Sequence, residues 1–463
     1  MLRFLLLLTS LAPLAASAAP ICRAKPAPGV KLIVSITHDD TDDNQATTAA
    51  PILEAHGMRG TFYVNVGRII PEGATSGYMV LSQVLAMEAA GHEIGIHGLD
   101  HQSDLITNIP LARMKRELCD SRSEAMLMGL HPRSFAFPNG LYDDYTRSLA
   151  YSCGYNSARS VGATEITSSG PYYETIPPAD AYAIRAPSSF ESPDSTLAIL
   201  QGYVTRAETS AASARKTGWL AMNFHNVCAD YTSCPGGQTN HTISTSVYTA
   251  FLDWLQPRAA SGTVVKTISQ VFGGPLKPAV SSGTPPMILG DMESYIGGAT
   301  NAPDCWLRYQ SGTSTGTWSR VTGFTGAGYA QQVVMSSWVS GGAWVLRQND
   351  SSSDYRSCTT QVTPGHSYTM SCSYRSDVPV RLHFYHRDAT TGAWLTLSTT
   401  ATSAASPVAV SKVSSTLTAP GSAFVDRTLS FGVEITTVCS SGCLNGNNTG
   451  TLIVDDCNVV DNG

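Results

Sequence analysis

Between residues 30 and 272, two kinds of apolar pattern alternate along the chain. Short apolar runs rich in β-branched and aromatic residues predict strands, and the segments between them, apolar at every third or fourth position, predict helices. This alternation indicates βα units with a parallel sheet, most economically a distorted (β/α) barrel. The predicted strands are 31–37, 60–66, 92–97, 133–138 and 219–225, and the predicted helices are 44–57, 81–91, 111–130 and 246–259.

The pattern changes after residue 272. Residues 273–286, "GGPLKPAVSSGTPP", have the Pro, Gly and Ser content of a linker. Residues 287–461 are rich in Ser, Thr and Gly, with short alternating runs such as "PVRLHFYHR". We therefore expect a catalytic-type α/β domain at 30–272 and a second, all-β sandwich at 287–461.

The first residues have the pattern of a secretory signal peptide. Arg3 precedes an apolar stretch that ends in the small residues Ala16, Ser17 and Ala18. No later stretch is long and apolar enough to span a bilayer. We expect residues 1–18 to be removed and the protein to be secreted, outside the cell or in the cell wall.

Export makes disulfides the expected state of the eleven cysteines. Five precede residue 280 and six follow residue 300, so an unpaired one is expected in the first half. Cys228 and Cys234 are close enough to close a short loop, although pairings cannot be deduced from sequence. Asn240, Asn349 and Asn447 begin glycosylation sequons, which matter only in a eukaryotic host.

The charge balance excludes one class of partner. The formal net charge is -6 and the chain has no basic run, which argues against nucleic acid. We expect a monomer.

Polar residues follow several predicted strands. Asp39 and Asp40 follow the first, His97 and His225 follow later ones, and the "FPNG" segment follows another. In a parallel barrel the carboxyl ends of the strands form one face, where active sites lie. Residues far apart in sequence are therefore expected to converge there.

His97 and His101 have the spacing that places two imidazoles on one side of a helical turn. With one carboxylate they would make a catalytic metal site that keeps positions open for water. Alone, such a pair is more often two ordinary histidines. Adjacent aspartates point in different directions, so one can bind metal while the other takes a proton.

Two further aspartates and one histidine have simpler interpretations. We expect Asp42 and Asp43 to lie in a solvated loop at a helix start, where they suit the helix dipole. A lone histidine such as His225 in an apolar strand is more often a core residue, but its place at the strand end favours function.

At these residues the chain resembles the metal-dependent polysaccharide deacetylases, carbohydrate esterase family four. The family's Thr-Phe-Asp-Asp-Gly motif appears as "THDDT", and its His-(Ser/Thr)-x-x-His motif appears as "HGLDH" within "GHEIGIHGLDH". The third motif, commonly Arg-x-Pro-Tyr-Gly, appears as "AFPNG", and Leu-x-His corresponds to "MNFH". The resemblance covers residues 30 to 272.

The resemblance implies a role for each matched residue. Asp39 would be the general base, and Asp40, His97 and His101 would hold a divalent metal. Zinc suits these ligands best, although cobalt or nickel would fit them. His225 would be the general acid, and the backbone N–H of Asn139 would help bind the oxyanion.

The chain departs from the family pattern at three motifs. Thr41 stands for the usual glycine, and His38 stands for phenylalanine, so that either the first loop is shaped differently or a further imidazole faces the site. Ala136 stands where an arginine often orients the catalytic aspartate, and Arg185 is the candidate to supply it, with a surface ion pair as the alternative. The fourth motif is not recognised, and Asp180 is its candidate replacement.

The C-terminal region resembles jelly-roll carbohydrate-binding modules. In such folds acidic residues of the first and last strands can share a structural calcium, for which Asp291, Glu293 and Asp455 are the candidates. Its tryptophans would stack on sugar rings or, more commonly in a sandwich, lie in the core. They are Trp306, Trp318, Trp338, Trp344 and Trp394.

These observations predict a secreted metal-dependent deacetylase acting on an acetylated polysaccharide, with chitin or a related N-acetylated aminosugar polymer favoured. One alternative is an O-deacetylase of acetylated xylan. The other is a catalytically weak carbohydrate-binding protein, suggested by Ala136, Thr41 and the missing fourth motif.

Overall fold

A computed structural model describes most of the chain. The described residues are 26–70, 72–73, 77–102, 109–167, 169–232, 234, 241–294, 302–310, 313–338, 343–348, 358–387, 394–399, 403–419, 428–435 and 449–463. The expected signal peptide 1–18, Cys22, and the sequon residues Asn240, Asn349 and Asn447 lie outside these ranges.

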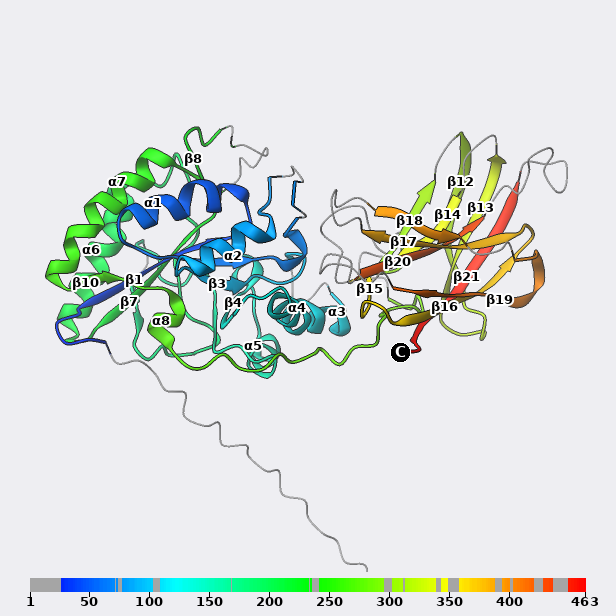
Figure 1. The fold of residues 1–463 in the computed structure, drawn as a ribbon, viewed down its shortest axis with the longest axis horizontal. Helices are drawn as coiled ribbons and strands as arrows, with labels where there is room; N and C mark the ends of the chain where they lie inside the picture. The colour runs from blue at the N-terminus through cyan, green and yellow to red at the C-terminus, as the bar shows by residue number, and fades with distance from the viewer. Residues whose placement is uncertain are drawn as a thin grey trace, which may run out of the picture.

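The first domain is built on one curled sheet in the order β5-β4-β3-β2-β1-β7-β6 (Figure 1). Along one side of β1, Leu32–Val34 pair with β10 and Thr37–Asp39 pair with β2, so the sheet curls around β1. All pairings in this sheet are parallel except that of β6 with β7. The strands are β1 (Leu32–Asp39), β2 (Thr61–Val64), β3 (Glu93–Ile96), β4 (Ser134–Ala136), β5 (Ser157–Arg159), β6 (Glu174–Thr175), β7 (Gly218–Phe224) and β10 (Thr263–Val265).

Helices cover the outer face of this sheet (Figure 1). The α-helices are α1 (Ala50–Ala55), α2 (Leu81–Ala89), α3 (Leu111–Lys115), α4 (Ser121–Leu127), α5 (Asp144–Ser152), α6 (Leu197–Ser213), α7 (Thr245–Leu255) and α8 (Ile268–Phe272). Shorter elements are η1 (Gln45–Ala49), η2 (Val66–Arg68), η3 (Arg116–Asp120), η4 (Pro138–Gly140), η6 (Gln256–Ser261), β8 (Asn226–Cys228) and β9 (Thr242–Ser244). This curled sheet with helices is consistent with the predicted distorted barrel.

The alternation of side chains along a strand separates two cores. On β1, Leu32, Val34 and Ile36 face outward and belong to the large core shared with the helices. Ile33 faces inward and packs with Trp219 and other residues in the barrel interior. Asp39 falls on the inward side by the same alternation, and His38 falls on the outward side.

His38 ties β1 to β7 and α7 on the outer side of the sheet. Its Nδ1 lies 2.9 Å from the carbonyl oxygen of His225, to which it must donate, so its Nε2 accepts from the hydroxyl of Tyr248, also at 2.9 Å. Burial lowers the pKa of His38 to about 4. The expectation that His38 would face the site is therefore wrong, because strand alternation directs it away from Asp39.

An ion pair spans the gap between the two ends of the curled sheet. Ile184 forms a parallel bridge with Arg159 at the end of β5, and Glu174 lies on β6 at the other edge. The guanidinium of Arg185 donates to both carboxylate oxygens of Glu174 at 2.9 and 2.8 Å. The edge at β5 and the edge at β6 are thus joined through side chains and not through a continuous row of backbone hydrogen bonds.

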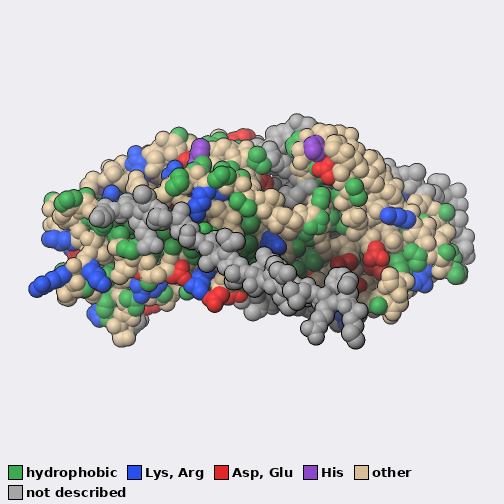
Figure 2. Space-filling model, turned by 90° about the horizontal axis from the view of Figure 1, so that it is seen from below, with side chains coloured by type: hydrophobic (Ala, Val, Ile, Leu, Met, Phe, Trp, Pro, Cys, Tyr) green, Lys and Arg blue, Asp and Glu red, His purple; other side chains and the backbone are tan. Residues whose placement is uncertain are grey.

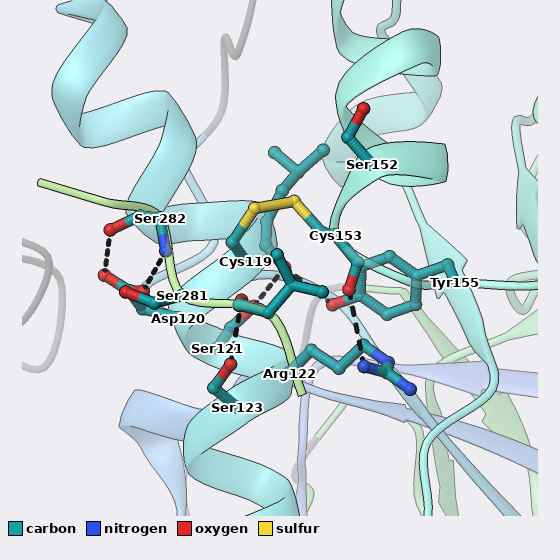
Figure 3. Close-up of a disulfide and its surroundings, with 12 residues drawn as sticks. Cys119, Asp120, Ser121, Arg122, Ser123, Ser152, Cys153, Tyr155, Ser281 and Ser282 are labelled. Atoms are coloured by element: carbon teal, nitrogen blue, oxygen red, sulfur yellow. Dashed lines mark hydrogen bonds between the residues drawn. A yellow bond between two sulfur atoms is a disulfide. The ribbon is translucent and has the colours of Figure 1, made fainter. Parts of the chain in front are cut away.

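Residues 273–286 contain no helix or strand and bind along the first domain as a strap (Figure 1). Arg122 donates to the carbonyls of Lys277 and Pro278 at 2.6 and 2.8 Å. Ser282 donates from its amide and hydroxyl to Asp120, beside the Cys119–Cys153 disulfide (Figure 3).

Arg116 extends this binding to the second domain. It is fully buried and donates to Thr284, to the carbonyls of Pro285 and Pro286, and to the carbonyl of Thr359 beyond the strap. One guanidinium therefore joins η3, the strap and the C-terminal domain.

The C-terminal residues form two antiparallel sheets around a separate core. One sheet contains β11 (Trp306–Gln310), β14 (Ala343–Gln348), β15 (Thr360–Gln361), β17 (Val380–Arg387), β18 (Trp394–Thr399) and β20 (Thr428–Ile435). The other contains β12 (Ser314–Thr322), β13 (Tyr329–Trp338), β16 (Ser367–Ser376), β19 (Ser406–Thr418) and β21 (Gly450–Asp461). The jelly-roll identity of this domain stays a prediction.

Four disulfides join described cysteines: Cys119–Cys153, Cys228–Cys234, Cys305–Cys358 and Cys372–Cys457. The short loop closed by Cys228 and Cys234 is confirmed. The two bridges before residue 280 use every cysteine of the first half except Cys22.

Two surface properties agree with the sequence. On the face shown in Figure 2, Lys and Arg side chains are interspersed with Asp and Glu among the described residues. Within the described part of the chain, no helix combines the length and apolar character needed to cross a membrane.

The Arg116 contacts generate a first test. Arg116→Met would leave the carbonyls of Pro285 and Pro286 and the buried carbonyl of Thr359 without their donor, at about 1–3 kcal/mol for the buried group. We expect a lower melting temperature and faster protease cleavage between the two domains. Arg147→Met is the control, because Arg147 pairs with Asp144 and Asp180 within the first domain. Equal cleavage rates in the two variants would contradict this role.

His38 generates a second test, on pH dependence. Between about pH 4 and 6.5 an unfolded histidine binds a proton that buried His38 does not, so the native protein loses stability as pH falls through this window. His38→Phe removes this loss together with two hydrogen bonds. We expect its destabilisation relative to the native protein to shrink by up to about 1.4 kcal/mol per pH unit on acidification, measured by denaturant unfolding. Parallel stability curves for the two proteins would refute this assignment.

Candidate active site

Asp39 ends β1 with its carboxylate inside the barrel, bound to one arginine. A terminal nitrogen of Arg159, the last residue of β5, lies 2.6 and 2.5 Å from the two carboxylate oxygens. Burial alone would raise the pKa of Asp39, but the charge of Arg159, with smaller effects of His97 and His225, holds that pKa below its usual value. Asp39 is therefore an oriented, ionised carboxylate.

Arg159 is itself held by an aromatic ring. Its guanidinium carbon lies 5.1 Å from the ring centre of Tyr63 on β2, a cation–π arrangement. The Tyr63 ring needs the absence of a side chain at Gly95, where a Cβ atom would lie 2.5 Å from the ring. Residues of β2, β3 and β5 thus shape the site around one buried guanidinium.

The prediction that Arg185 orients Asp39 is wrong. Arg185 binds Glu174 instead, and the arginine beside Asp39 comes from β5. Sequence reasoning missed Arg159 because its strand is only three residues long and was not predicted. Its one signal is a charged residue at the end of the short segment "NSAR".

Asp40 turns away from Asp39 and toward the two predicted histidines. Its φ is 88° and that of Thr41 is 72°, so the chain takes a left-handed turn directly after the strand. Asp40 Oδ1 lies 3.7 Å from His97 Nε2 and 3.2 Å from His101 Nε2. The adjacent aspartates therefore have separate partners, as their position predicts.

Asp40, His97 and His101 fit a divalent cation. One donor atom from each residue lies within 4.8 Å of the other two. The buried Asp40 Oδ1 accepts no hydrogen bond, and two imidazoles with a carboxylate are a donor set suited to zinc. Among the described residues, this is the only such group of three.

The tautomer of His97 supports the same conclusion. Its Nδ1 lies 2.8 Å from the carbonyl oxygen of Ala136 and must donate to it, which leaves the lone pair of Nε2 directed at Asp40. Burial lowers the pKa of His97 to about 4, so the ring is neutral at physiological pH. Ala136 thus supports the site through its backbone, although it lacks the family's arginine side chain.

The spacing of His97 and His101 has a different structural basis from the predicted helical turn. Residues 97–101 form a loop between β3 and the following segment, with positive φ at Gly98 and His101. Backbone contacts of this loop, not helix geometry, bring the two rings to a centroid distance of 4.8 Å.

The prediction of a solvated loop is wrong for Asp42. Its side chain is buried, and burial together with the neighbouring Asp40 raises its pKa well above the usual value. Asn44 rather than an aspartate precedes η1, and it caps no helix amide with its side chain. Asp43 is half-buried.

Thr41 stands where the resembled motif has a glycine, and its positive φ is strained for a residue with a side chain. Hydrogen bonds of its hydroxyl offset this strain. Its hydroxyl accepts from the amide of Asn65 at 2.7 Å and donates to the Asn65 carbonyl at 3.4 Å. The Asn65 side chain in turn donates to the carbonyl of His97. These hydrogen bonds stabilise the left-handed turn that carries Asp40.

His225 directly follows β7 and approaches the other carboxylate oxygen of Asp40. Its Nε2 is 3.6 Å from Asp40 Oδ2, and its buried Nδ1 has no hydrogen-bond partner. Burial lowers its pKa. The prediction that Asp180 tunes this histidine is wrong, because Asp180 binds Arg147 and the amide of Tyr182.

Asn139 lies in η4, three residues after Ala136, whose carbonyl binds His97. Its φ is 53°, and its side chain is exposed. Asn139 is therefore at the same strand-end edge as the other candidates, and its oxyanion role stays a prediction.

The calcium candidates of the C-terminal domain do not form a comparable group. The buried Asp455 carboxylate accepts from Phe324 and Asp456 amides, and the exposed Glu293 accepts from the Tyr329 amide at 2.9 Å. Asp291 is exposed and accepts a 3.4 Å bond from the Glu293 amide. Burial raises the pKa of Asp455 to about 6.

The described tryptophans of this domain pack inward. Trp306 is buried and donates to the carbonyl of Leu289, and Trp318 packs partly buried against the core. The core interpretation therefore holds for Trp306. The side chains of Trp338, Trp344 and Trp394 lie outside the described residues.

Comparisons with solved structures find chains of low similarity. A deacetylase, PplD, from Streptococcus pyogenes is 24% identical, with 27% of this chain and 54% of that chain covered and a TM-score of 0.25. A polysaccharide deacetylase from Mycobacterium smegmatis, described as putative in its name, is 17% identical (54% and 93% covered, TM-score 0.35). The peptidoglycan deacetylase PdaC from Bacillus subtilis is 15% identical (53% and 92% covered, TM-score 0.33).

The present chain thus spans about half the length of PplD. A search of curated proteins found no match. The family model for polysaccharide deacetylase matches residues 27–158, which include Asp39, Asp40, His97 and His101. This match supports a polysaccharide deacetylase domain in the N-terminal part of the chain.

Proposed function

We propose that the protein is a metal-dependent deacetylase that hydrolyses acetyl groups from an N-acetylated polysaccharide, with chitin or a related aminosugar polymer as the favoured substrate. The convergence of Asp40, His97 and His101 beside Asp39 and His225 carries this proposal. The signal-like sequence at residues 1–18 supports action outside the cell.

Asp40, His97 and His101 would hold the cation, with zinc as the first choice and cobalt or nickel as substitutes. A bound divalent ion polarises the acetyl carbonyl and lowers the pKa of a water molecule at the open positions. Cation binding would require neutral imidazoles and an ionised Asp40 carboxylate. The pKa of His97 is lowered, which favours the neutral ring, and the pKa of Asp40 is lowered, which favours the ionised carboxylate.

Asp39 would act as the general base. Its Oδ2 lies 3.9 Å from His97 Nε2, so it borders the cation site without belonging to it. Arg159 keeps the carboxylate ionised and donates to both of its oxygens, which restricts rotation of the side chain. This geometry allows Asp39 to take a proton from the attacking water.

His225 would act as the general acid that protonates the leaving amine. It follows β7, and its Nε2 lies 3.6 Å from Asp40 Oδ2, so that it borders the proposed cation site as a donor to the leaving group would. The carbonyl of His225 accepts from His38, which fixes the backbone at this position. The N–H of Asn139 would help stabilise the tetrahedral oxyanion.

One observation favours a catalytically weak carbohydrate-binding protein as a second candidate. The buried Nδ1 of His225 has no hydrogen-bond partner that would orient the ring. The proposed base, acid and metal ligands are nevertheless all present. An O-deacetylase of acetylated xylan would use the same residues on an ester.

Acetate release tests these functions directly. We expect purified protein to release acetate from chitin oligomers, to lose this activity after chelation, and to recover it when zinc is restored. Release from acetylxylan but not from chitin oligomers would select the ester substrate. Retention on insoluble polysaccharide with no acetate release from any substrate would select the binding protein.

Arg159 gives a residue-level test. Arg159→Met removes the charge that keeps Asp39 ionised, so we expect kcat/KM to fall by about 100-fold or more and the acidic limb of its pH profile to move to higher pH. Arg185→Met is the matched control and should retain most of the activity, because Arg185 binds Glu174. The assignment fails if the two variants lose activity equally.

A further inference from the structure

The loop 97–101 carries both histidines of the proposed cation site at its two ends. Because it is neither helix nor strand, its own hydrogen bonds do not determine the separation of the two rings. On one side it is held through its carbonyls: the amides of Val66 and Gly67 donate to Gly98 and Leu99 at 3.2 and 2.8 Å.

On the other side the loop is held by one carboxylate. Glu117 Oε2 accepts from the amide of Leu99 at 2.7 Å and from the amide of Asp100 at 3.1 Å. Both donors lie between the two histidines. A shift of this carboxylate would therefore move the loop segment that separates them.

The approach of Glu117 depends on a glycine. At Gly98, whose φ is 87°, a Cβ atom would lie 2.9 Å from Glu117 Oε2. Any side chain at this position would be strained in its backbone and would push the carboxylate away. Gly98 and Glu117 therefore act together.

Glu117 is buried, whereas a glutamate on a helix surface is ordinarily exposed to solvent. It is fully inaccessible to solvent on the π-helical turn η3, and its Oε1 has no hydrogen-bond partner. Burial raises its pKa to about 7, with Asp100 adding to the rise and Arg113 opposing it. Such a placement is costly unless it stabilises something specific.

Two consecutive residues of the π-helical turn η3 bind different parts of the molecule. Arg116 binds the strap and the Thr359 carbonyl, whereas Glu117 binds the loop 97–101. π turns inside helices are frequent at functional sites, where they redirect side chains.

We propose that Glu117 is a positioning residue for the cation site, which sets the separation of His97 and His101 by binding the backbone between them. This inference rests on the proposed function in so far as that function places a divalent cation at Asp40, His97 and His101. Glu117 touches neither the cation nor the substrate, and it acts through the amides of Leu99 and Asp100.

A second buried glutamate provides a matched control. Glu93, at the start of β3, accepts from Thr61, Ser134 and the amide of Ser269 at 3.0, 2.6 and 2.7 Å. It is comparably buried and hydrogen-bonded, but it lies at the other end of the strand from His97. Glu93→Gln should destabilise the fold without reaching the cation site.

The experiment measures zinc affinity of the full chain by competition with a chromophoric chelator. We expect Glu117→Ala to weaken zinc binding by about 10- to 100-fold, the usual effect of removing a residue that orients metal ligands. Glu117→Gln keeps the shape and an acceptor oxygen and should lie between Glu117→Ala and the native protein. Glu93→Gln should keep native affinity. The visible spectrum of the cobalt-loaded protein should change in the Glu117 variants alone.

Three results separate the possibilities. Native zinc affinity in a folded Glu117→Gln or Glu117→Ala would overturn the inference, and so would an equal loss in Glu93→Gln. If Glu117→Ala does not fold, Glu117→Gln and the cobalt spectrum decide. Weaker zinc binding in the Glu117 variants of a protein that releases no acetate would support the inference while the proposed function fails.

Discussion

Burial of charge at the carboxyl end of a parallel sheet is the constraint on which the rest of this site depends. Asp39 and Arg159 are almost inaccessible to solvent, and Asp40 lies beside three imidazoles and, at 3.6 Å, the guanidinium of Arg68. An unpaired charge in such surroundings would be costly, so each needs a partner with good geometry. The Asp39–Arg159 pair meets this requirement within the protein, whereas the Asp40 group meets it most completely with a cation.

The last two residues of β1 and the residue that follows it take three different roles, because the strand alternates and then turns. His38 faces the helices and joins β1 to β7 and α7. Asp39 faces the barrel interior and binds Arg159. Asp40 follows in a left-handed conformation that places it beside His97 and His101. Without that turn, stabilised by Thr41 and Asn65, strand alternation would direct Asp40 to the outward side of the sheet, away from His97 and His101.

The supports of the site extend beyond the sheet. Tyr63 holds Arg159 and Glu117 holds the loop 97–101, and in both cases a glycine supplies the space, Gly95 and Gly98. On the same helical turn as Glu117, Arg116 binds the strap and the C-terminal domain. The site and the interface between the domains therefore share one structural element.

The sequence by itself determined the features that are written in local patterns. The βα alternation predicted a parallel sheet in a distorted (β/α) barrel, with which the observed curled sheet is consistent. The motifs around Asp39, Asp40, His97 and His101 predicted a group that the structure brings together. Strand alternation is a local property, so the separate roles of adjacent aspartates could also be predicted. The change of composition after residue 272 indicated a second region rich in strands.

Only the tertiary structure decided which distant residue meets each of these groups. Arg159 rather than Arg185 binds Asp39, because pairing across the sheet depends on strand order and register, which a three-residue strand does not reveal. Asp42 is buried because elements far away in sequence cover it. His38 faces outward by strand alternation, but its partners His225 and Tyr248 also come from distant parts of the chain. Glu117 was not recognised because its hydrogen bonds go to backbone amides, which leave no signature in the residues that they join.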